Sequence, residues 1–152
     1  MTQILSNTDH MFSIDKIEKS AKIHVSCRVL DETNTRAEWN LHYGDGDSRN
    51  KNGIILGELA LQRADLMGVQ KVLEQAIHSN DPSPHITTDS KYLFMVDMFR
   101  PKWKSIGWTY MNGSELLNRK QIVLVDTLIG KFENVRIELV PGPRYTPNAG
   151  FL

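Results

Sequence analysis

The sequence predicts a single α/β domain: a mixed sheet with elements in the order βββαβααβ and with the helices packed on the sheet. Two segments near the start alternate between apolar and polar residues, which is typical of strands, whereas apolar residues recur at helical spacing after Leu61. No internal repeat or linker divides the chain. The length of 152 residues fits one domain, since domains usually contain about 100–200 residues.

The first three strands are predicted from alternation and from the turn signals between them. Residues 22–30 carry an apolar side chain at every second position, and residues 37–43 repeat the pattern. The segment 44–53 (GDGDSRNKNG) is rich in residues that adopt turn conformations, and the apolar run 54–59 follows it. Three strands in succession predict an antiparallel meander. The residues expected to face inward are Ile23, Val25, Cys27, Val29, Ala37, Trp39, Leu41 and Tyr43.

A long amphipathic helix is predicted over residues 61–78. Apolar residues recur there at spacings of three and four, which places them on one helical face. These residues are Leu66, Val69, Leu73 and Ile77. The segment SNDPSP that follows should end the helix, because proline cannot donate a helical hydrogen bond.

The second half of the chain is expected to contain two strands and two helices. Residues 85–89 (HITTD) predict a short buried strand, after which Ser90 can cap a helix. We expect this helix to end near residue 99, before Pro101. The remaining elements are a helix over residues 114–129 and a strand over residues 135–140. The tail PGPRYTPNAGFL contains too much proline and glycine for regular structure.

Composition and charge are typical of a globular protein that is neither secreted nor inserted in a membrane. Eighteen Lys and Arg residues balance eighteen Asp and Glu residues, which argues mildly against tight electrostatic binding of a duplex. The single cysteine, Cys27, cannot form an intrachain disulfide, which is compatible with a reducing compartment. No apolar run could span a bilayer, and residues 1–20 lack the apolar core of a signal peptide. We interpret residues 1–20 as an N-terminal extension and residues 21–152 as the domain, and expect an intracellular protein of the cytoplasm or nucleus.

Several short motifs, in this order along the chain, resemble those of the ribonuclease H family. In that family an R-A-E-L-like motif carries an acid on the first helix, and a T-D-S motif carries another at the end of the fourth strand. Here the helix reads Arg63-Ala64-Asp65-Leu66 and the strand end reads Thr88-Asp89-Ser90. Further similar positions are Trp103, Gly107-Trp108, Leu117-Asn118 and Val140-Pro141-Gly142. The resemblance spans about residues 22–147 and implies a ribonuclease H-like fold from which the terminal helix is missing.

The resemblance also implies where catalytic acids would lie, and most of those positions differ here. Cys27 stands at the first acidic position, Asp65 replaces a glutamate, Asp89 is retained, and Pro143 stands at the position of a loop histidine. No residue before Leu152 matches the fourth acid. The family's mechanism uses two divalent ions about 3.5–4 Å apart. Magnesium prefers anionic oxygen ligands, and a thiol is too soft for it. We therefore expect no cofactor, or at most one weakly bound Mg²⁺ or Mn²⁺ on Asp65 and Asp89.

A purely structural interpretation also exists for each of three residues, Cys27, Asp65 and Asp89. Cys27 shares its alternating face with apolar residues, so a buried structural thiol is favoured over a reactive one. Asp65 could be a vestigial metal ligand, or only a favourable acid in the first turn of a helix. Asp89 could belong to a surviving acidic pocket, because sheet ends beside crossovers hold sites in α/β proteins, or it could only cap a helix.

A basic segment that contains tryptophan, residues 100–108, indicates contact with nucleic acid. It combines positive charge with rings suited to contacts with phosphate and sugar. In the family the corresponding region holds the DNA strand of a hybrid, and two polar positions elsewhere contact the nucleic-acid backbone. The alternative is that both tryptophans pack in the core and that the polar residues are ordinary surface positions. The candidate nucleic-acid-binding residues are Gln62, Lys102, Trp103, Lys104, Trp108 and Asn118.

The leading hypothesis is a catalytically degenerate ribonuclease H-like domain, a pseudoenzyme that acts as a binding or scaffold module. Its partner would be nucleic acid, either an RNA/DNA hybrid or double-stranded RNA, or another protein. The missing terminal helix could expose apolar surface and so support a homo- or hetero-oligomer. The alternative hypothesis is a weak Mg²⁺- or Mn²⁺-dependent endonuclease that hydrolyses the RNA of RNA/DNA hybrids.

Overall fold

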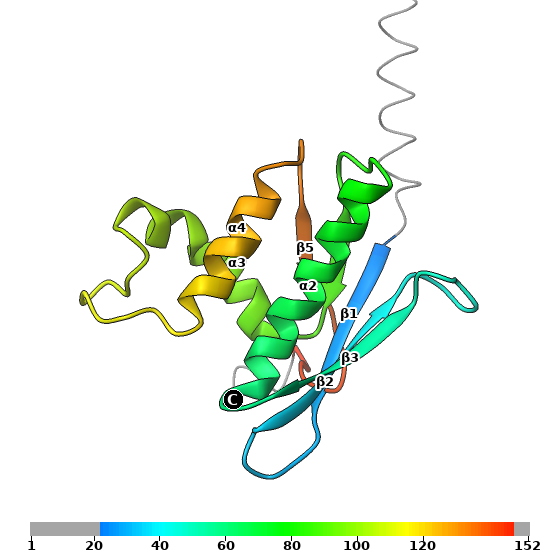
Figure 1. The fold of residues 1–152 in the computed structure, drawn as a ribbon, viewed down its shortest axis with the longest axis horizontal. Coiled ribbons are helices and arrows are strands. Elements are labelled where there is room, and N and C mark those ends of the chain that lie inside the picture. The colour runs from blue at the N-terminus through cyan, green and yellow to red at the C-terminus, as the bar shows by residue number, and fades with distance from the viewer. Residues whose placement is uncertain (1–21, 148–152) are drawn as a thin grey trace, which may run out of the picture.

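The computed structural model describes residues 22–147, which form one mixed sheet with helices packed on it (Figure 1). The spatial order of the strands is β3-β2-β1-β4-β5. The first three strands are antiparallel neighbours, whereas β4 lies parallel to β1 and β5 parallel to β4. The predicted fold class and the order βββαβααβ are therefore confirmed. The elements are β1 (Lys22–Val29), β2 (Arg36–His42), β3 (Lys51–Leu56), α2 (Ala60–His78), β4 (His85–Thr88), α3 (Lys91–Ser105), α4 (Arg119–Ile129) and β5 (Arg136–Leu139).

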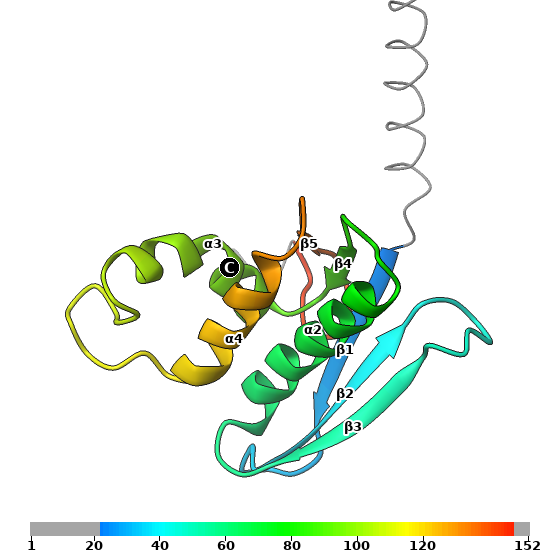
Figure 2. The ribbon, with the colours of Figure 1, turned by 45° about the horizontal axis from the view of Figure 1, so that its top comes forward.

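The core lies between the sheet and the helices. Helix α2 runs along β1 and β2 with α4 beside it, and α3 packs against β5 (Figures 1 and 2). Val25 and Ala37 of the sheet are fully buried, as the alternation predicts. Val29 and Ile77 were expected to face inward but are 44% and 40% exposed. Both lie at the end of their element, where the neighbouring layer no longer covers them.

Strand β3 begins and ends three residues earlier than the sequence predicts. It comprises Lys51–Leu56 rather than residues 54–59. Polar Lys51 belongs to the strand because its backbone pairs with Leu41 of β2 in the antiparallel ladder. Backbone pairing does not depend on side-chain polarity, so the apolar run marks the wrong boundary. The strand ends before Gly57, whose φ of 111° suits only glycine.

Helix α3 continues through Pro101, where the sequence predicts its end. The predicted cap is present, since Oγ of Ser90 accepts a hydrogen bond from the backbone N–H of Leu93 at 3.1 Å. Proline removes one helical hydrogen bond. Trp103, however, lies on the next turn and is only 5% exposed. We attribute the continuation to the burial of this large side chain, which offsets the lost hydrogen bond.

Helix α4 begins at Arg119, five residues later than the predicted start at residue 114. An antiparallel bridge between Thr109 and Glu115 keeps the preceding segment out of helical geometry. Asn118 has a φ of 60°, a left-handed conformation that cannot continue a right-handed helix. The end of α4 at Ile129 agrees with the prediction.

The two ends of the described chain bear on the remaining predictions. The proposed extension, residues 1–20, lies outside the described residues. After β5, the described tail forms turns and a bridge between Gly142 and Tyr145, and up to residue 147 it contains no helix. None of the helices in residues 22–147 is both long enough and apolar enough to span a bilayer.

Candidate active site

Three of the predicted site residues meet at one end of the sheet. Cys27 lies near the end of β1, Asp89 directly follows β4, and Asp65 lies in the second turn of α2. Because β1 and β4 are parallel neighbours, their carboxyl ends lie at the same edge of the sheet. The two carboxylates are buried, at 1% exposed for Asp65 and 2% for Asp89. Cys27 is also buried, and its thiol is a hydrogen-bond neighbour of Asp65.

Arg144, which the sequence analysis did not select, contacts both acids. Its guanidinium donates to the two carboxylate oxygens of Asp65, with Nη1–Oδ1 and Nη2–Oδ2 distances of 2.7 and 2.9 Å. Its backbone N–H donates to Oδ2 of Asp89 at 2.9 Å. A bidentate pair of this kind is among the strongest hydrogen-bonded contacts that a carboxylate makes. One residue of the tail therefore joins two acids from different elements.

The local conformation of the tail brings Arg144 into this position. A β-carbon at Gly142 would lie 2.7 Å from Oδ2 of Asp89, so only glycine allows the backbone to approach this closely. Gly142 and Tyr145 exchange two backbone hydrogen bonds, of 2.9 and 3.0 Å, and so close a tight turn around Arg144. The ammonium of Lys91 lies 5.3 Å from the ring centroid of Tyr145, a contact that ties the turn to the start of α3.

A partial signal for Arg144 exists in the sequence. It is the one basic residue in the tail PGPRYTPNAGFL, directly after the position that the resemblance aligns with a loop histidine. A charged residue next to a position that reaches an acidic site is a candidate partner for those acids. Its bidentate geometry depends on the turn and could not be derived from residue order.

Most carboxylate oxygens of Asp65 and Asp89 already accept hydrogen bonds from other groups of the protein. Oγ of Ser90 donates to Oδ2 of Asp65 at 2.8 Å, in addition to the two bonds from Arg144. Among the described residues, Oδ1 of Asp89 is buried without a hydrogen-bond partner. Three of the four oxygens of these two acids therefore accept hydrogen bonds, and one does not.

These contacts test whether the side chains suit the two divalent ions that the resemblance implies. Magnesium requires several hard oxygen ligands in near-octahedral geometry, and only one carboxylate oxygen of Asp89 is unengaged. The guanidinium of Arg144 is paired with Asp65, and the backbone N–H of Arg144 is bonded to Asp89. This positive charge beside the acids would repel a metal cation. In the part of the chain that the structure describes, no three His, Cys, Asp or Glu side chains are grouped so that they could hold a metal ion. The arrangement does not fit a pair of divalent ions.

Cys27 is predicted to be unreactive in the folded protein. Burial raises the pKa of its thiol, and the neighbouring Asp65 raises this pKa further. The thiolate, which is the reactive form, is therefore scarce near neutral pH. We expect a disulfide reagent such as DTNB to label Cys27 at least about a hundredfold more slowly in native than in urea-unfolded protein. Fast labelling of the native protein would instead indicate an activated or accessible thiol.

The predicted nucleic-acid-binding residues divide into buried and exposed groups. Trp103 is 5% exposed, and its ring lies 5.9 Å from that of Phe99 and 6.1 Å from that of Tyr110, centroid to centroid. This burial supports the structural alternative for Trp103, a core residue, over contact with nucleic acid. Lys102 is exposed, and Lys104 is mostly exposed although it forms an ion pair of 3.1 Å with Asp126.

The two predicted amides take part in internal hydrogen bonds. Oε1 of Gln62 accepts a bond of 2.9 Å from Asn34, and Nδ2 of Asn118 donates to the hydroxyl of Tyr92 at 3.2 Å. Both side chains are only partly buried. Each amide therefore retains a second polar atom that a bound molecule could contact.

A basic groove lies beside the start of α4. Its volume is about 1050 Å³, and it brings together cations from distant parts of the sequence. Arg63 comes from α2, two residues before Asp65, and Arg119 and Lys120 come from the first turn of α4. These three residues are not among the binding residues predicted from the sequence, because they meet only in the folded chain. The groove is lined by Arg63, Trp108, Glu115, Leu116, Leu117, Asn118, Arg119, Lys120, Gln121 and Val123.

Comparisons with known proteins find a family model and solved structures that are similar to this chain. A family model described as RNase H matches residues 26–148. A foamy viral protease–reverse transcriptase, solved in complex with dsDNA, is similar with a TM-score of 0.62, 18% identity and 86% of each chain covered. The RNase H domain of PFV is similar with a TM-score of 0.59 and 15% identity, over 84% of this chain and 82% of that one. No curated protein matches the sequence.

The match to the family model covers most of the chain, and the described fold agrees with it. The sheet order, the placement of Asp65 and Asp89 at one sheet edge, and the order of the motifs are all consistent with the same relationship. The structural likenesses, at under 20% identity, support the fold alone. On the strength of the family match over residues 26–148, this chain belongs to the ribonuclease H family.

Proposed function

We propose that this domain binds nucleic-acid duplexes, with RNA/DNA hybrid as the first candidate, and does not hydrolyse them. The observation that carries the proposal is the bidentate pair between Arg144 and Asp65. The pair supports the interpretation that the fold is intact while a cation of the protein itself, the guanidinium of Arg144, occupies the acidic site. The basic groove beside α4 supports the binding part of the proposal.

Absence of hydrolysis follows from what the site residues can do. Phosphodiester hydrolysis requires an activated water and stabilisation of a developing negative charge. The carboxylate of Asp65 is held by Arg144 and Ser90, so it is not free to position a water. Burial raises the pKa of the Cys27 thiol, which therefore stays protonated and supplies no negative charge. Asp89 retains one unengaged oxygen, which is too little for the two-ion chemistry of the family.

Binding is supported by where the positive charge lies rather than by its total. The net charge of the chain is zero, but the groove contains three cations and one acid, Glu115. Contacts between cations and phosphates supply most of the sequence-independent affinity for nucleic acid. Trp108 is partly exposed in the same groove and offers a ring to a sugar or base. A few such contacts predict moderate affinity with a clear dependence on salt.

A binding experiment tests the first half of the proposal. Labelled RNA/DNA hybrid, double-stranded RNA and single strands would be titrated with the protein at several salt concentrations. We expect the hybrid to bind and its affinity to fall as salt rises, and we expect Arg119→Ala with Lys120→Ala to weaken binding at least about tenfold and to flatten the salt dependence. Lys131→Ala is the matched control, because Lys131 is exposed and lies outside the groove.

The outcomes separate the candidate partners. Equal loss of affinity in Lys131→Ala would contradict binding through the groove. If no nucleic acid bound, the protein-interaction hypothesis would take precedence, and α3 would be the surface to examine first. Large apolar side chains are exposed on that helix, namely Phe94, Met95, Met98 and Phe99.

A cleavage assay tests the second half. We expect the unmodified protein to leave an RNA/DNA hybrid intact in either Mg²⁺ or Mn²⁺, because the site does not fit two divalent ions. An active ribonuclease H would be the positive control for substrate and buffer. Metal-dependent cleavage by the unmodified protein that is abolished in Asp89→Asn would establish the endonuclease alternative instead.

A further inference from the structure

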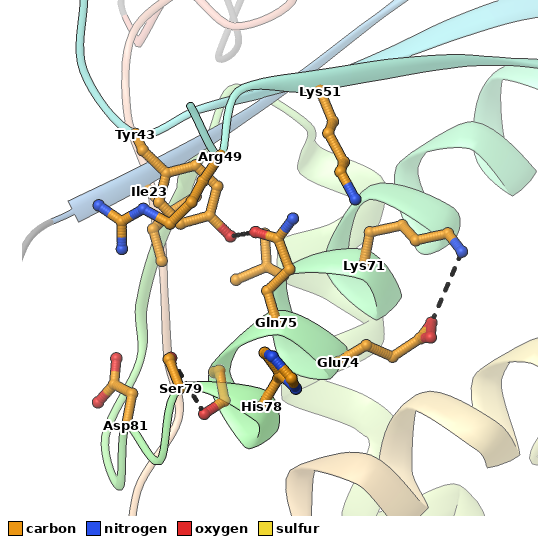
Figure 3. Close-up of a pocket in the computed structure, with 12 residues that line it drawn as sticks. Ile23, Tyr43, Arg49, Lys51, Lys71, Glu74, Gln75, His78, Ser79 and Asp81 are labelled. Carbon is orange, nitrogen blue, oxygen red and sulfur yellow. Dashed lines mark hydrogen bonds and ion pairs between the residues drawn. The ribbon is translucent and has the colours of Figure 1, made fainter. Parts of the chain in front are cut away.

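A second hollow lies at the opposite end of the sheet from Asp65 and Asp89. It opens between the C-terminal half of α2 and the hairpin that joins β2 to β3, beside Ile23 at the start of β1 (Figure 3). We call it the hairpin pocket. Its volume of about 490 Å³ falls within the range of roughly 300–1,000 Å³ that is usual for small-molecule sites. It shares no lining residue with the groove beside α4.

The floor of the hairpin pocket is apolar. Ile23, Val72 and Ala76 line it, and these side chains are 5%, 0% and 5% exposed. The ring of Tyr43, which is partly buried, forms part of the wall. A floor of this kind favours a ligand with an apolar or planar body.

The polar wall presents hydrogen-bond donors to the hollow. The hydroxyl of Tyr43 donates to Oε1 of Gln75, and burial raises the pKa of this hydroxyl, which keeps it protonated as a donor. Because the amide oxygen of Gln75 is already used, its NH₂ group is left to donate. Figure 3 shows this amide nitrogen on the side toward Lys51, which extends from β3 toward α2.

Three cations border the same hollow, and their existing partners differ. Arg49 lies over the ring of Tyr43, 4.4 Å from its centroid, and pairs with Asp47 at 2.7 Å. Lys71 is 3.9 Å from Glu74, and both side chains are over 40% exposed, so this ion pair is weak. Within residues 22–147, no carboxylate lies within ion-pair distance of Lys51.

Two acids on the rim of the hairpin pocket lower its affinity for an anion, but the pocket still favours an anion over a cation. Glu74 and Asp81 also line the hollow, so the pocket contains three cations and two acids. An anion bound between Lys51 and Lys71 would replace Glu74 as the ion-pair partner of Lys71. A ligand cation would instead meet Lys51, Lys71 and the amide NH₂ group, none of which can accept a hydrogen bond.

We propose that the hairpin pocket binds a phosphate monoester that carries an apolar or aromatic body of about the size of a mononucleoside. The phosphate contacts the ammonium groups of Lys51 and Lys71 and the amide NH₂ of Gln75. The body lies on Val72 and its apolar neighbours in the floor. Phosphate offers mainly acceptors at neutral pH, which matches the donors that Lys51, Lys71 and Gln75 present to the hollow.

The test uses the full 152-residue chain, labelled with ¹⁵N, and adenosine 5′-monophosphate as the probe. Adenosine and inorganic phosphate are the comparison arms, since each supplies one half of the proposed ligand. We expect the monophosphate to shift backbone amide signals around the hairpin pocket and to bind at least about tenfold more tightly than either half. Lys51→Ala should weaken the monophosphate about tenfold, which is the loss expected for one charge-assisted contact.

Two further variants keep the outcome interpretable. Lys71→Ala should also weaken the monophosphate, whereas Lys131→Ala, an exposed lysine outside the pocket, should bind it as the unmodified protein does. Thermal melting of each variant would verify that it is folded. Absence of binding, unchanged binding in both Lys51→Ala and Lys71→Ala, or signal changes confined to the α4 groove would each overturn the proposal. Because no lining residue is shared, none of these results depends on duplex binding.

Discussion

Replacing Arg144 with alanine is expected to lower the free energy of unfolding by about 3–5 kcal/mol, the usual loss when one partner of a buried ion pair is removed. The carboxylate of Asp65 is 1% exposed, and Arg144 supplies two of the hydrogen bonds that it accepts. Without the guanidinium, a buried negative charge would keep only the hydroxyl of Ser90 and the weakly donating thiol of Cys27 as partners. Urea unfolding followed by circular dichroism would measure the change.

Two further variants show whether the loss comes from the buried charge. Arg136→Ala is a matched control, because Arg136 is 62% exposed and pairs with Glu138 at 3.4 Å; its loss should stay below about 1 kcal/mol. Adding Asp65→Asn to Arg144→Ala removes the uncompensated charge and should recover part of the stability. If Arg144→Ala lost no more than Arg136→Ala, Asp65 would not depend on Arg144, and the proposal of an internally filled site would fail.

Trp103→Ala is expected to lower the free energy of unfolding by about 3–5 kcal/mol, as large-to-small substitutions of buried aromatic residues do. The Trp103 ring lies between Phe99 and Tyr110 in the core. Chemical unfolding would measure the loss. Trp108→Ala should cost less stability than Trp103→Ala. The Trp108 ring is partly exposed, so folding removes less of its apolar area from water.

The binding assay adds a second readout to this pair of variants. Trp108→Ala should weaken hybrid binding while the protein stays folded, because Trp108 lines the α4 groove. Trp103→Phe keeps an aromatic ring in the core and should leave hybrid affinity unchanged. A folded Trp103→Phe variant with clearly reduced affinity would show that Trp103 contacts nucleic acid after all.

Much of the fold could be predicted because it depends on local periodicity. Alternation over residues 22–30 and 37–43 and helical spacing over residues 61–78 each reflect a face that must be buried. The predicted boundaries were wrong where packing or pairing opposed the local signal. Lys51 joined a strand through its backbone, and helix α3 continued through Pro101 toward the buried Trp103.

The candidate site was predictable to a similar extent. Parallel neighbouring strands place their carboxyl ends at one edge, so the meeting of Cys27, Asp65 and Asp89 followed from the topology and the motifs. Arg144 could not be placed, because its position depends on the close approach of Gly142 to Asp89. A side chain that is positioned by one irregular turn, as Arg144 is, leaves no periodic pattern in the sequence from which its role could be predicted.

The sequence by itself determined the fold class, the long helix, and which acids remain near the end of the central strands, because each rests on spacing along the chain. Only the tertiary structure decided what surrounds those acids and where positive charge collects. Arg63 and Arg119 lie 56 positions apart (119 − 63) and meet in one groove, and Arg144 reaches Asp65 across 79 positions. Such contacts depend on the packing of whole elements, and electrostatic pairing between distant residues leaves no pattern within either segment.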